Sequence, residues 1–296
     1  MFLDYIKLIR PLHWIKNTLI FLPPFFLSVI FKDDIIWRLP LGFLSFSLVA
    51  SSIYIINDIF DREHDKLHPE RNQRPLATGN AKTSVAWFLS VLFLMLGFSL
   101  VCFSKNFLIA SLSLAFYFIT NISYSCGLKN IPVLDVFLLS SGFVFRIFFG
   151  GAFFNIPISS WLFLCVFSVA LYFAFGKRKS EFKKYADNGR PVLKKYTEMF
   201  LNAHYYLFCV LSILFYCLWT IMRTGLNEHS VGKFALTIPF MIFIVARYNL
   251  VVETSNEYAD PVPTLFRDRW LLLATGFFVF TNFIFLYEEP LKMLFK

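Results

Sequence analysis

Long apolar runs alternate with short polar segments along almost the whole chain. Each run approaches the roughly 20 residues that a helix needs to cross a lipid bilayer. We therefore predict nine transmembrane helices, at residues 15–31, 39–58, 85–104, 106–125, 132–152, 157–176, 203–222, 233–250 and 271–287. Pro23 and Pro24 should break or kink the first helix, because each removes a backbone donor. The pattern predicts an all-α integral membrane protein, organised as a single domain over residues 1–296.

Composition supports this prediction, and charge gives it an orientation. The chain is 57% hydrophobic and 16% charged, whereas about a quarter of the residues of soluble domains are charged. Of the 28 lysines and arginines, 18 lie in the N-terminus and in the loops after the second, fourth, sixth and eighth predicted helices, and Lys16 and Arg247 lie within four residues of these parts. Because loops rich in basic residues stay on the cytoplasmic side, we expect these parts in the cytoplasm and the C-terminus outside.

An acidic motif stands where the second predicted helix reaches the cytoplasm, in the segment IINDIFDREHDKLHPERNQRPLATG at 55–79. Asp58, Asp61 and Asp65 are three and four residues apart, so they project from one face of a helix. Asn57 lies beside them. Three carboxylates on one face repel each other unless a cation lies between them. Since Mg²⁺ takes one or two protein carboxylates and fills its shell with water and phosphate oxygens, the three aspartates predict a Mg²⁺ site.

Basic residues follow the acidic motif within the same segment. Positive side chains bind phosphate groups directly, so metal ligands and cations side by side predict a site for a diphosphate. The basic candidates in this segment are Arg62, Lys66, Arg71 and Arg74. The alternative interpretation is a charged helix end that is only solvated.

Two ionisable residues lie in the fifth predicted helix. Asp135 and Arg146 are eleven residues apart, which places them on one face but about 16 Å apart along the axis. They therefore cannot form a direct pair. Ionisable groups inside a membrane are candidates for function, and we expect Arg146 to point into the helix bundle, toward a substrate phosphate or a polar partner. The alternative is an arginine that only caps backbone carbonyls.

A strongly basic segment, GKRKSEFKKYADNGRPVLKKYT at 176–197, follows the sixth predicted helix. Lys177 and Arg178 stand where this helix leaves the membrane, and we consider them candidates for phosphate binding. Such loops also serve as topology signals or contact anionic lipids. Both interpretations stay open for the segment as a whole.

The acidic motif resembles the N-D-x-x-D-x-x-x-D motif of the UbiA-type membrane prenyltransferase superfamily, and Asn57, Asp58, Asp61 and Asp65 match every specified position. Within that superfamily the chain is more similar to the bacterial decaprenyl-phosphate phosphoribosyltransferases. The similarity is carried by segments from most of the chain: RPLHWIKN (10–17), NDIFDREHDKLHPERNQRPLATG (57–79), YSCGLKNIPVLDV (124–136), GFVFRIFFGG (142–151), KRKSE (177–181), RPVLKKYT (190–197) and RDR (267–269).

The resemblance implies a fold, a reaction and a set of site residues. The fold would be nine transmembrane helices around a central cavity open to the cytoplasm, in the inner membrane of a bacterial cell. The reaction would transfer 5-phosphoribose from phosphoribosyl diphosphate to a polyprenyl phosphate, with Mg²⁺ as cofactor, for the synthesis of cell-wall glycan precursors. Asp58, Asp61 and Asp135 would be catalytic. The substrates would be bound by Lys16, Asn57, Arg62, Arg71, Arg74, Tyr124, Lys129, Arg146, Lys177 and Arg178.

Two departures from the superfamily's pattern bear on the substrate. Arg71 is followed by Asn72, where many relatives have a second basic residue. Aromatic prenyltransferases carry a second Asp-rich motif after the sixth helix, where this chain is basic. A metal site after the second helix and cations after the sixth favour substrates that bring one metal-bound diphosphate and further phosphate groups.

Alternatives to this reaction stay open. The three alternatives are an aromatic-ring prenyltransferase with a polyprenyl diphosphate donor, a membrane transporter and a structural membrane subunit. A homo-oligomer is compatible with the sequence, and nothing in it points to nucleic acid.

Overall fold

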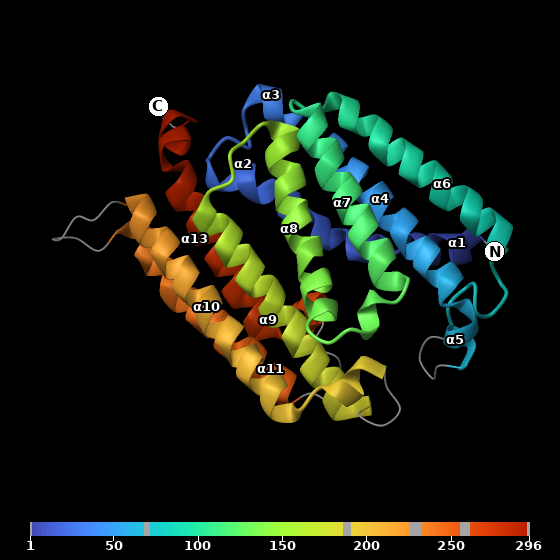
Figure 1. Cartoon of the computed structure of the whole chain (residues 1–296). Helices are drawn as coiled ribbons and strands as arrows, with labels where there is room; N and C mark the ends of the chain where they lie inside the picture. The colour runs from blue at the N-terminus through green and yellow to red at the C-terminus, as the bar shows by residue number, and fades with distance from the viewer. Residues whose placement is uncertain (1, 68–71, 186–190, 225–231, 255–260, 295–296) are drawn as a thin grey trace. The chain divides into compact units, whose positions relative to one another are not determined.

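The computed structural model describes residues 2–67, 72–185, 191–224, 232–254 and 261–294, and every regular element in these ranges is a helix (Figure 1). The chain divides into two compact units, each with its own buried core. The first unit comprises Met1–Phe25, Val29–Lys129 and Ser141–Pro157. The second comprises Phe26–Ser28, Asn130–Ser140 and Ile158–Lys296.

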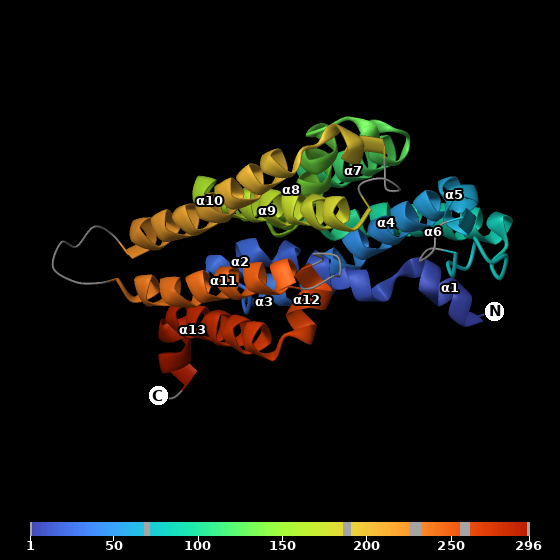
Figure 2. The same cartoon turned by 90° about the horizontal axis from the view of Figure 1, so that it is seen from below.

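The first unit is built around the long helix α4 (Leu39–Phe60), with α6 (Thr83–Ser99) and α7 (Phe107–Ser125) packed beside it (Figure 1). The later part of α8 (Leu134–Phe154) also belongs to this unit. Its shorter elements are α1 (Phe2–Ile9), η1 (Pro11–Phe21), α2 (Leu22–Phe26), α3 (Asp33–Ile36), α5 (Arg62–Leu67), η2 (Leu100–Phe103) and η3 (Leu128–Asn130). The helices α1 and η1 both pack against α4 (Figure 2).

Two buried serines of α4 fix its contact with α6. Ser45 Oγ donates to the carbonyl of Gly97 at 2.7 Å, and Ser52 Oγ lies 3.2 Å from Ser90 Oγ. These serines are seven residues apart, which brings them to the same face of a helix. A Cβ at Gly97 would stand 2.6 Å from Val49 Cγ2. The missing side chain therefore lets the two helix backbones approach closely, as small residues do between membrane helices.

Two further serines of α4 hold η1, a 3₁₀ helix of 11 residues, although such helices seldom exceed three or four. Trp14 Nε1 donates to Ser51 Oγ and Asn17 Nδ2 donates to Ser47 Oγ, both at 2.9 Å. Three residues of a 3₁₀ helix rise about 6 Å, and four residues of an α-helix also rise about 6 Å. Because η1 and α4 run antiparallel at these two pairs, the 3₁₀ geometry keeps Trp14 level with Ser51 and Asn17 level with Ser47. An α-helix over the same residues of η1 would lose this match.

The second unit contains two pairs of long helices. The helices α9 (Ser160–Tyr185) and α10 (Glu198–Thr224) run side by side, and α11 (Ile238–Thr254) packs on α13 (Arg269–Leu294) (Figure 2). The short elements of this unit are η4 (Pro191–Lys195), η5 (Lys233–Thr237) and α12 (Pro261–Arg267).

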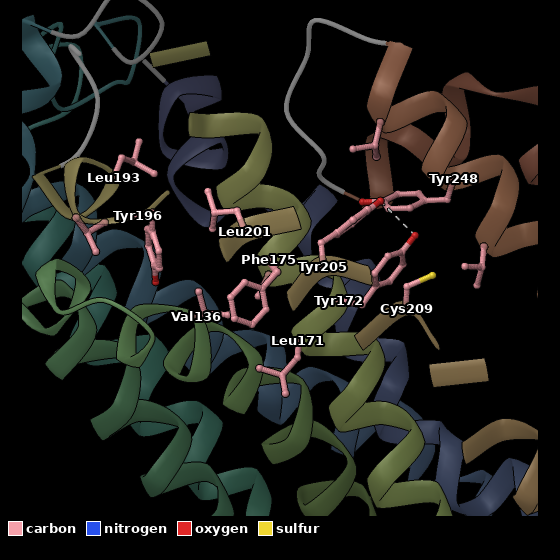
Figure 3. Packing of buried hydrophobic residues seen from close by; sticks show 14 of the residues in the cluster. Val136, Leu171, Tyr172, Phe175, Leu193, Tyr196, Leu201, Tyr205, Cys209 and Tyr248 are labelled. Atoms are coloured by element: carbon pink, nitrogen blue, oxygen red, sulfur yellow. Dashed lines mark hydrogen bonds between the residues drawn. The ribbon is translucent and has the colours of Figure 1, made fainter. Parts of the chain in front are cut away.

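Tyrosines from three helices meet in the core of the second unit (Figure 3). The rings of Tyr172 in α9 and Tyr205 in α10 stack with centroids 4.9 Å apart, and Tyr248 of α11 packs edge-on against Tyr172. Both Tyr172 and Tyr205 donate their hydroxyls to Asn249 Oδ1. A buried hydroxyl without a partner is costly, so this shared acceptor lets polar groups lie in an apolar core.

Eight helices in the described part of the chain are long and apolar enough to cross a membrane: Asp33–Phe60, Thr83–Phe103, Phe107–Ser125, Leu134–Phe154, Ser160–Lys184, Glu198–Arg223, Lys233–Thr254 and Arg269–Glu288. Each overlaps one predicted helix. The predicted first helix at 15–31 is not among them, so the count of nine is not confirmed. That segment instead holds η1 and the five-residue α2, and Pro23 and Pro24 stand at the start of α2, where a helix needs no backbone donor.

Candidate functional site

The acidic motif lies at a break between two helices of the first unit. Helix α4 ends at Phe60 and α5 begins at Arg62, so Asp58 is the last aspartate of α4, Asp61 lies at the break and Asp65 is in α5. The backbone stays close to helical across this point, because Asp61 N donates to Asn57 O and Asp65 N donates to Asp61 O. The predicted spacing of the three aspartates is therefore preserved through the break.

Two of the aspartates converge on one arginine. Arg74 Nη1 donates to Asp58 Oδ1 at 2.9 Å and to Asp65 Oδ2 at 2.6 Å. A second arginine, Arg10, donates from Nη2 to Asp58 Oδ1 at 2.5 Å. Asp58 and Asp65 are 2–3% exposed, whereas Arg10 and Arg74 are 19% and 23% exposed. Buried carboxylates thus face cations that still reach solvent.

The third aspartate and the asparagine have partners near the end of α7. Lys129 Nζ donates to Asp61 Oδ1 at 3.0 Å, and Ser125 Oγ donates to Asn57 Oδ1 at 2.8 Å. Lys129 is 24% exposed and Asp61 16%. The term acidic cluster is used below for Asp58, Asp61 and Asp65 together with their cationic partners Arg10, Arg74 and Lys129.

The donors of the acidic cluster suit Mg²⁺. Among the residues that the structure describes, no group of three His, Cys, Asp or Glu side chains is arranged to hold a metal ion. Mg²⁺ does not require such a group, because it usually binds one or two carboxylates and otherwise water and phosphate oxygens. Asp58 and Asp65 already direct oxygen atoms at one cationic nitrogen, so these two predicted ligands fit the ion, whereas Asp61 bonds Lys129 instead.

Arg62, the other described arginine that was predicted in this segment, does not join the cluster. Arg62 Nη1 contacts Thr83 Oγ1 at 3.3 Å, and its side chain is 39% exposed. Beside it, the ammonium of Lys66 lowers the pKa of the exposed Glu63 carboxyl. Arg71 lies outside the described residues. Of the two described arginines predicted here to bind phosphate, the structure brings Arg74 to the aspartates and Arg62 to Thr83.

Arg146 faces the interior of the first unit, as predicted. It is 4% exposed. Its Nε donates to Asn17 Oδ1 at 2.8 Å, its Nη1 to Gly142 O at 2.6 Å, and its Nη2 to Tyr117 OH at 3.3 Å. The guanidinium also lies 5.1 Å from the ring centroid of Phe46. All of these partners are neutral, and one of them, Asn17, belongs to η1.

Asp135 belongs to a separate, sealed set of residues in the second unit. Arg178 Nε donates to Asp135 Oδ2 at 2.5 Å, and Arg178 Nη1 also bonds Glu181. Tyr196 OH donates to Asp135 Oδ1 at 2.6 Å and accepts from Val133 N at 2.7 Å. Burial and the bond to Asp135 raise the pKa of the Tyr196 phenol. We call Asp135, Arg178, Glu181 and Tyr196 the buried network.

The buried network changes the interpretation of Arg178. The sequence had suggested that Arg178 lies at a surface where phosphate can reach it. Asp135 and Arg178 are both 0% exposed, so Arg178 does not lie at such a surface. Asp135 and Arg146 each have other partners, in agreement with the prediction that they are not paired. Lys177, Lys16 and Tyr124 are all half-buried.

Three contributors escaped the sequence analysis. Arg10 lies in the RPLHWIKN segment, but nothing in its spacing indicated a contact with an aspartate 48 residues away. Tyr196 meets Asp135 across a similar separation in sequence. Glu181 carried a usable signal, because it follows Arg178 by three residues on one helix face, where opposite charges pair.

Comparison with known proteins places the chain in a family. The profile of the UbiA prenyltransferase family matches residues 21–194. The decaprenyl-phosphate phosphoribosyltransferase of Mycolicibacterium smegmatis is 34% identical over 282 residues, which cover 90% of this chain and 87% of that protein. The Corynebacterium glutamicum protein of the same name is 29% identical over 295 residues, covering 97% and 87%.

A solved structure agrees in fold. The UbiA homolog from Archaeoglobus fulgidus bound to GPP and Mg²⁺ superposes with a TM-score of 0.71 at 20% identity, over 95% of this chain and 98% of that one. The profile match spans more than half of the chain, and the similarity to the mycobacterial protein extends over most of both sequences. The chain belongs to the UbiA prenyltransferase family.

Proposed function

We propose that this protein transfers 5-phosphoribose from phosphoribosyl diphosphate to a polyprenyl phosphate and releases diphosphate. The observation that carries the proposal is the similarity over 90% of the chain to a protein named decaprenyl-phosphate phosphoribosyltransferase, at 34% identity. The acidic cluster supports it independently, because it combines oxygen donors for a metal with cations for phosphate.

In the proposed reaction, one bond to the anomeric carbon of ribose is exchanged for another. The bond from this carbon to the diphosphate breaks, and the electron pair leaves with the diphosphate. A phosphate oxygen of the acceptor lipid forms the new bond. Because that oxygen is already anionic near neutral pH, the reaction needs no strong general base.

Asp58, Asp61 and Asp65 are the proposed ligands of Mg²⁺, with Asn57 orienting the ligand shell or a ribose hydroxyl. The bound ion would neutralise charge on the diphosphate oxygens. Arg10, Arg74 and Lys129 compensate the carboxylates in the structure, and each is partly exposed. With Mg²⁺ and a diphosphate bound, these side chains would turn from the carboxylate oxygens to phosphate oxygens and form charge-assisted hydrogen bonds of the same kind.

The proposal for the buried network is more limited. Both carboxylate oxygens of Asp135 already accept hydrogen bonds, from Arg178 and from Tyr196. Asp135 stays the candidate for stabilising positive charge on the ribose or holding a ribose hydroxyl, and Arg178 acts through Asp135 as a positioning residue. Lys177, Tyr124, Arg62 and Arg71 stay weaker candidates for substrate contact.

The membrane arrangement is part of the same proposal. We place the N-terminus and the acidic cluster at the cytoplasmic face of a bacterial inner membrane, where phosphoribosyl diphosphate is soluble. The chain would act as one UbiA-like transmembrane domain, whose central cavity opens to the cytoplasm, with the C-terminus outside. A cysteine introduced at exposed Lys194 should then react with an impermeant reagent only from the cytoplasmic side, and reaction only from the outside would contradict this orientation.

The decisive experiment is a reconstituted transfer assay. Purified full-length protein in detergent is incubated with Mg²⁺, radiolabelled phosphoribosyl diphosphate and decaprenyl phosphate, and the label is followed into the lipid phase. We expect a labelled phospholipid product and stoichiometric diphosphate, both lost with excess chelator. Label that stays aqueous, together with transfer from a polyprenyl diphosphate to an aromatic acceptor, would overturn the proposal in favour of an aromatic prenyltransferase.

A further inference from the structure

A row of basic residues runs along η1 in the first unit. Side chains three residues apart eclipse one another on a 3₁₀ helix, so His13 and Lys16 lie on one line, with Arg10 directly before the helix. Arg10 and His13 meet the same ring: the Arg10 guanidinium lies 5.2 Å from the centroid of Tyr54, and the His13 ring lies 5.4 Å from it. We call Arg10, His13 and Lys16 the basic row.

The basic row is held in a fixed position relative to the acidic cluster. At one end, Arg10 bonds Asp58 and adopts a left-handed backbone conformation with φ of 53°, which a non-glycine residue adopts only at a cost. On the neighbouring line of η1, Trp14 and Asn17 are bonded to serines of α4. His13 and Lys16 therefore follow Arg10 at intervals of about 6 Å.

A buried positive charge, the guanidinium of Arg146, is bonded to η1 at the residue after Lys16. Lys16 is followed in η1 by Asn17, whose Oδ1 accepts from Arg146 Nε, and the Tyr117 hydroxyl accepts from Arg146 Nη2. Arg146 is 4% exposed, and its bonded partners in the described part of the chain are all neutral. A buried charge needs compensation, and next to Lys16 an anion would supply it.

The line of η1 beside the basic row is apolar. Leu12 and Ile15, again three residues apart, are 88% and 38% exposed. Exposed apolar side chains suit contact with hydrocarbon rather than water. One surface of η1 thus offers cations next to hydrocarbon contacts, the two features that a phosphorylated lipid presents together.

We propose that His13 and Lys16, with Arg146 beneath them, bind the phosphate group of the polyprenyl phosphate acceptor, whose isoprenoid chain runs along Leu12 and Ile15. Arg10 links this subsite to the diphosphate held at the acidic cluster. The inference rests on the proposed function and refines it, because it separates the acceptor phosphate from the other phosphates of the reaction.

The test measures binding of the two phosphates separately. Farnesyl phosphate represents the acceptor and ribose 5-phosphate the donor's phosphate ester, and farnesol controls for the apolar chain. Titration calorimetry with the full-length protein in detergent gives Kd for each in wild type, Lys16→Gln and Lys16→Arg. Lys7→Gln is the matched control, since Lys7 is 69% exposed in α1 and pairs with Asp4.

We expect Lys16→Gln to weaken farnesyl phosphate binding about 10-fold or more, as for a lost bond to a charged group, with farnesol and ribose 5-phosphate unchanged. Lys16→Arg should recover most of the affinity, and Lys7→Gln should match wild type. Unchanged farnesyl phosphate binding in Lys16→Gln, or no binding to wild type, would overturn the inference. Selective loss of ribose 5-phosphate binding would overturn it as well, since the row would then serve the donor.

The proposed function can fail independently of this inference. Farnesyl phosphate binding that depends on Lys16, in a protein that transfers no phosphoribose, would leave the lipid phosphate subsite intact and remove only the reaction. If the protein transfers phosphoribose but Lys16→Gln binds the acceptor as tightly as wild type, the proposed function stands and the lipid phosphate subsite is removed.

Discussion

The acidic cluster and the buried network contain the same kinds of side chain, carboxylates and arginines, but differ in access to solvent. Arg10, Arg74 and Lys129 are 19–24% exposed around the acidic cluster. In the buried network, Arg178 and Asp135 are both 0% exposed. The first arrangement can exchange a cation for a ligand without burying an uncompensated charge, whereas the second cannot.

This difference separates ion pairs that can open for a ligand at small cost from an ion pair whose loss the fold tolerates poorly. A partly exposed ion pair contributes little to stability, typically up to about 1 kcal/mol, so it can be opened at small cost. Breaking a buried pair by removing one partner costs about 3–5 kcal/mol. We therefore expect substitutions in the acidic cluster to act mainly on turnover and substitutions in the buried network to act mainly on stability.

The largest effect should come from Arg178→Met. The substitution leaves Asp135 and Glu181 buried without the guanidinium that both contact, and we expect the free energy of unfolding to fall by about 3–5 kcal/mol. Unfolding in detergent, followed by the thermal midpoint and by chemical denaturation, measures the loss. Lys194→Met, an exposed basic residue of η4, is the control and should change little.

A contrary result for Arg178 would revive the interpretation from sequence. If Arg178→Met were as stable as wild type and bound the donor more weakly, Arg178 would be a phosphate ligand, and the contrast between the two regions would disappear.

Substitution of the aspartates should reduce turnover with little loss of stability. Loss of groups that only support a metal ligand costs about 10–100-fold in affinity or activity. We therefore expect Asp58→Asn and Asp61→Asn to lower kcat/KM by at least about 100-fold, or roughly 2.7 kcal/mol. Mg²⁺ titration of the transfer rate should move to higher concentration in both variants.

Glu63→Gln provides the matched control for the aspartates. It removes one carboxylate from the same segment, but Glu63 is 75% exposed, and its ion-pair partners in the part of the chain that the structure describes are Arg62 and Lys66. Its kinetics should equal those of wild type. Near-native activity of Asp58→Asn and Asp61→Asn would remove the proposed metal site altogether.

Local spacing accounts for what the sequence could predict. Apolar runs predicted all eight long helices, and the spacing of Asp58, Asp61 and Asp65 predicted carboxylates on one face, of which Asp58 and Asp65 converge on Arg74. Both depend on interactions within about two turns, which periodicity encodes directly. The cations around the acidic cluster were only partly predicted, because Arg62 and Arg74 have the same charge and only tertiary structure distinguishes them.

Contacts across long separations could not be predicted in the same way. Arg10 meets Asp58 across 48 residues, and Arg178 meets Asp135 across 43. The 3₁₀ form of η1 is another such case, since it depends on matching Trp14 and Asn17 to serines of α4. A hydropathy pattern records that residues 15–31 are apolar but not that their register is set by another helix.

Arg146 tests an intermediate case, a buried arginine with neutral partners. Arg146→Met leaves Asn17 Oδ1 without its donor, and an unsatisfied buried polar atom costs about 1–3 kcal/mol. Because Asn17 helps to fix η1, we also expect a higher KM for the acceptor. Arg146→Lys keeps the charge but loses the planar fork, so it should fall between Arg146→Met and wild type in both measurements.

The outcome for Arg146 is read from stability and kinetics together. Donor KM, acceptor KM and kcat are measured in each variant alongside the thermal midpoint. Reduced stability with unchanged kinetics in the folded fraction would mean that Arg146 only caps its neighbours, and it would then leave the proposed acceptor site.

The smallest effect is expected from Arg62→Gln, compared with Arg74→Gln. Arg74 bonds both Asp58 and Asp65, whereas Arg62 contacts Thr83 at 3.3 Å and is 39% exposed. Exposed substitutions of this kind usually change stability by less than about 0.5 kcal/mol, and Arg62 has no bond in the acidic cluster to lose. Arg62→Gln should therefore keep donor KM within about twofold of wild type, whereas Arg74→Gln should raise it about 10-fold or more, as for a lost bond to a charged group.

The two variants remove the same charge from the same short segment, so net charge and long-range attraction of the donor change equally. Equal increases in donor KM would mean that the basic character of the segment matters and the position of each arginine does not, which would contradict the assignment of Arg74 to the site.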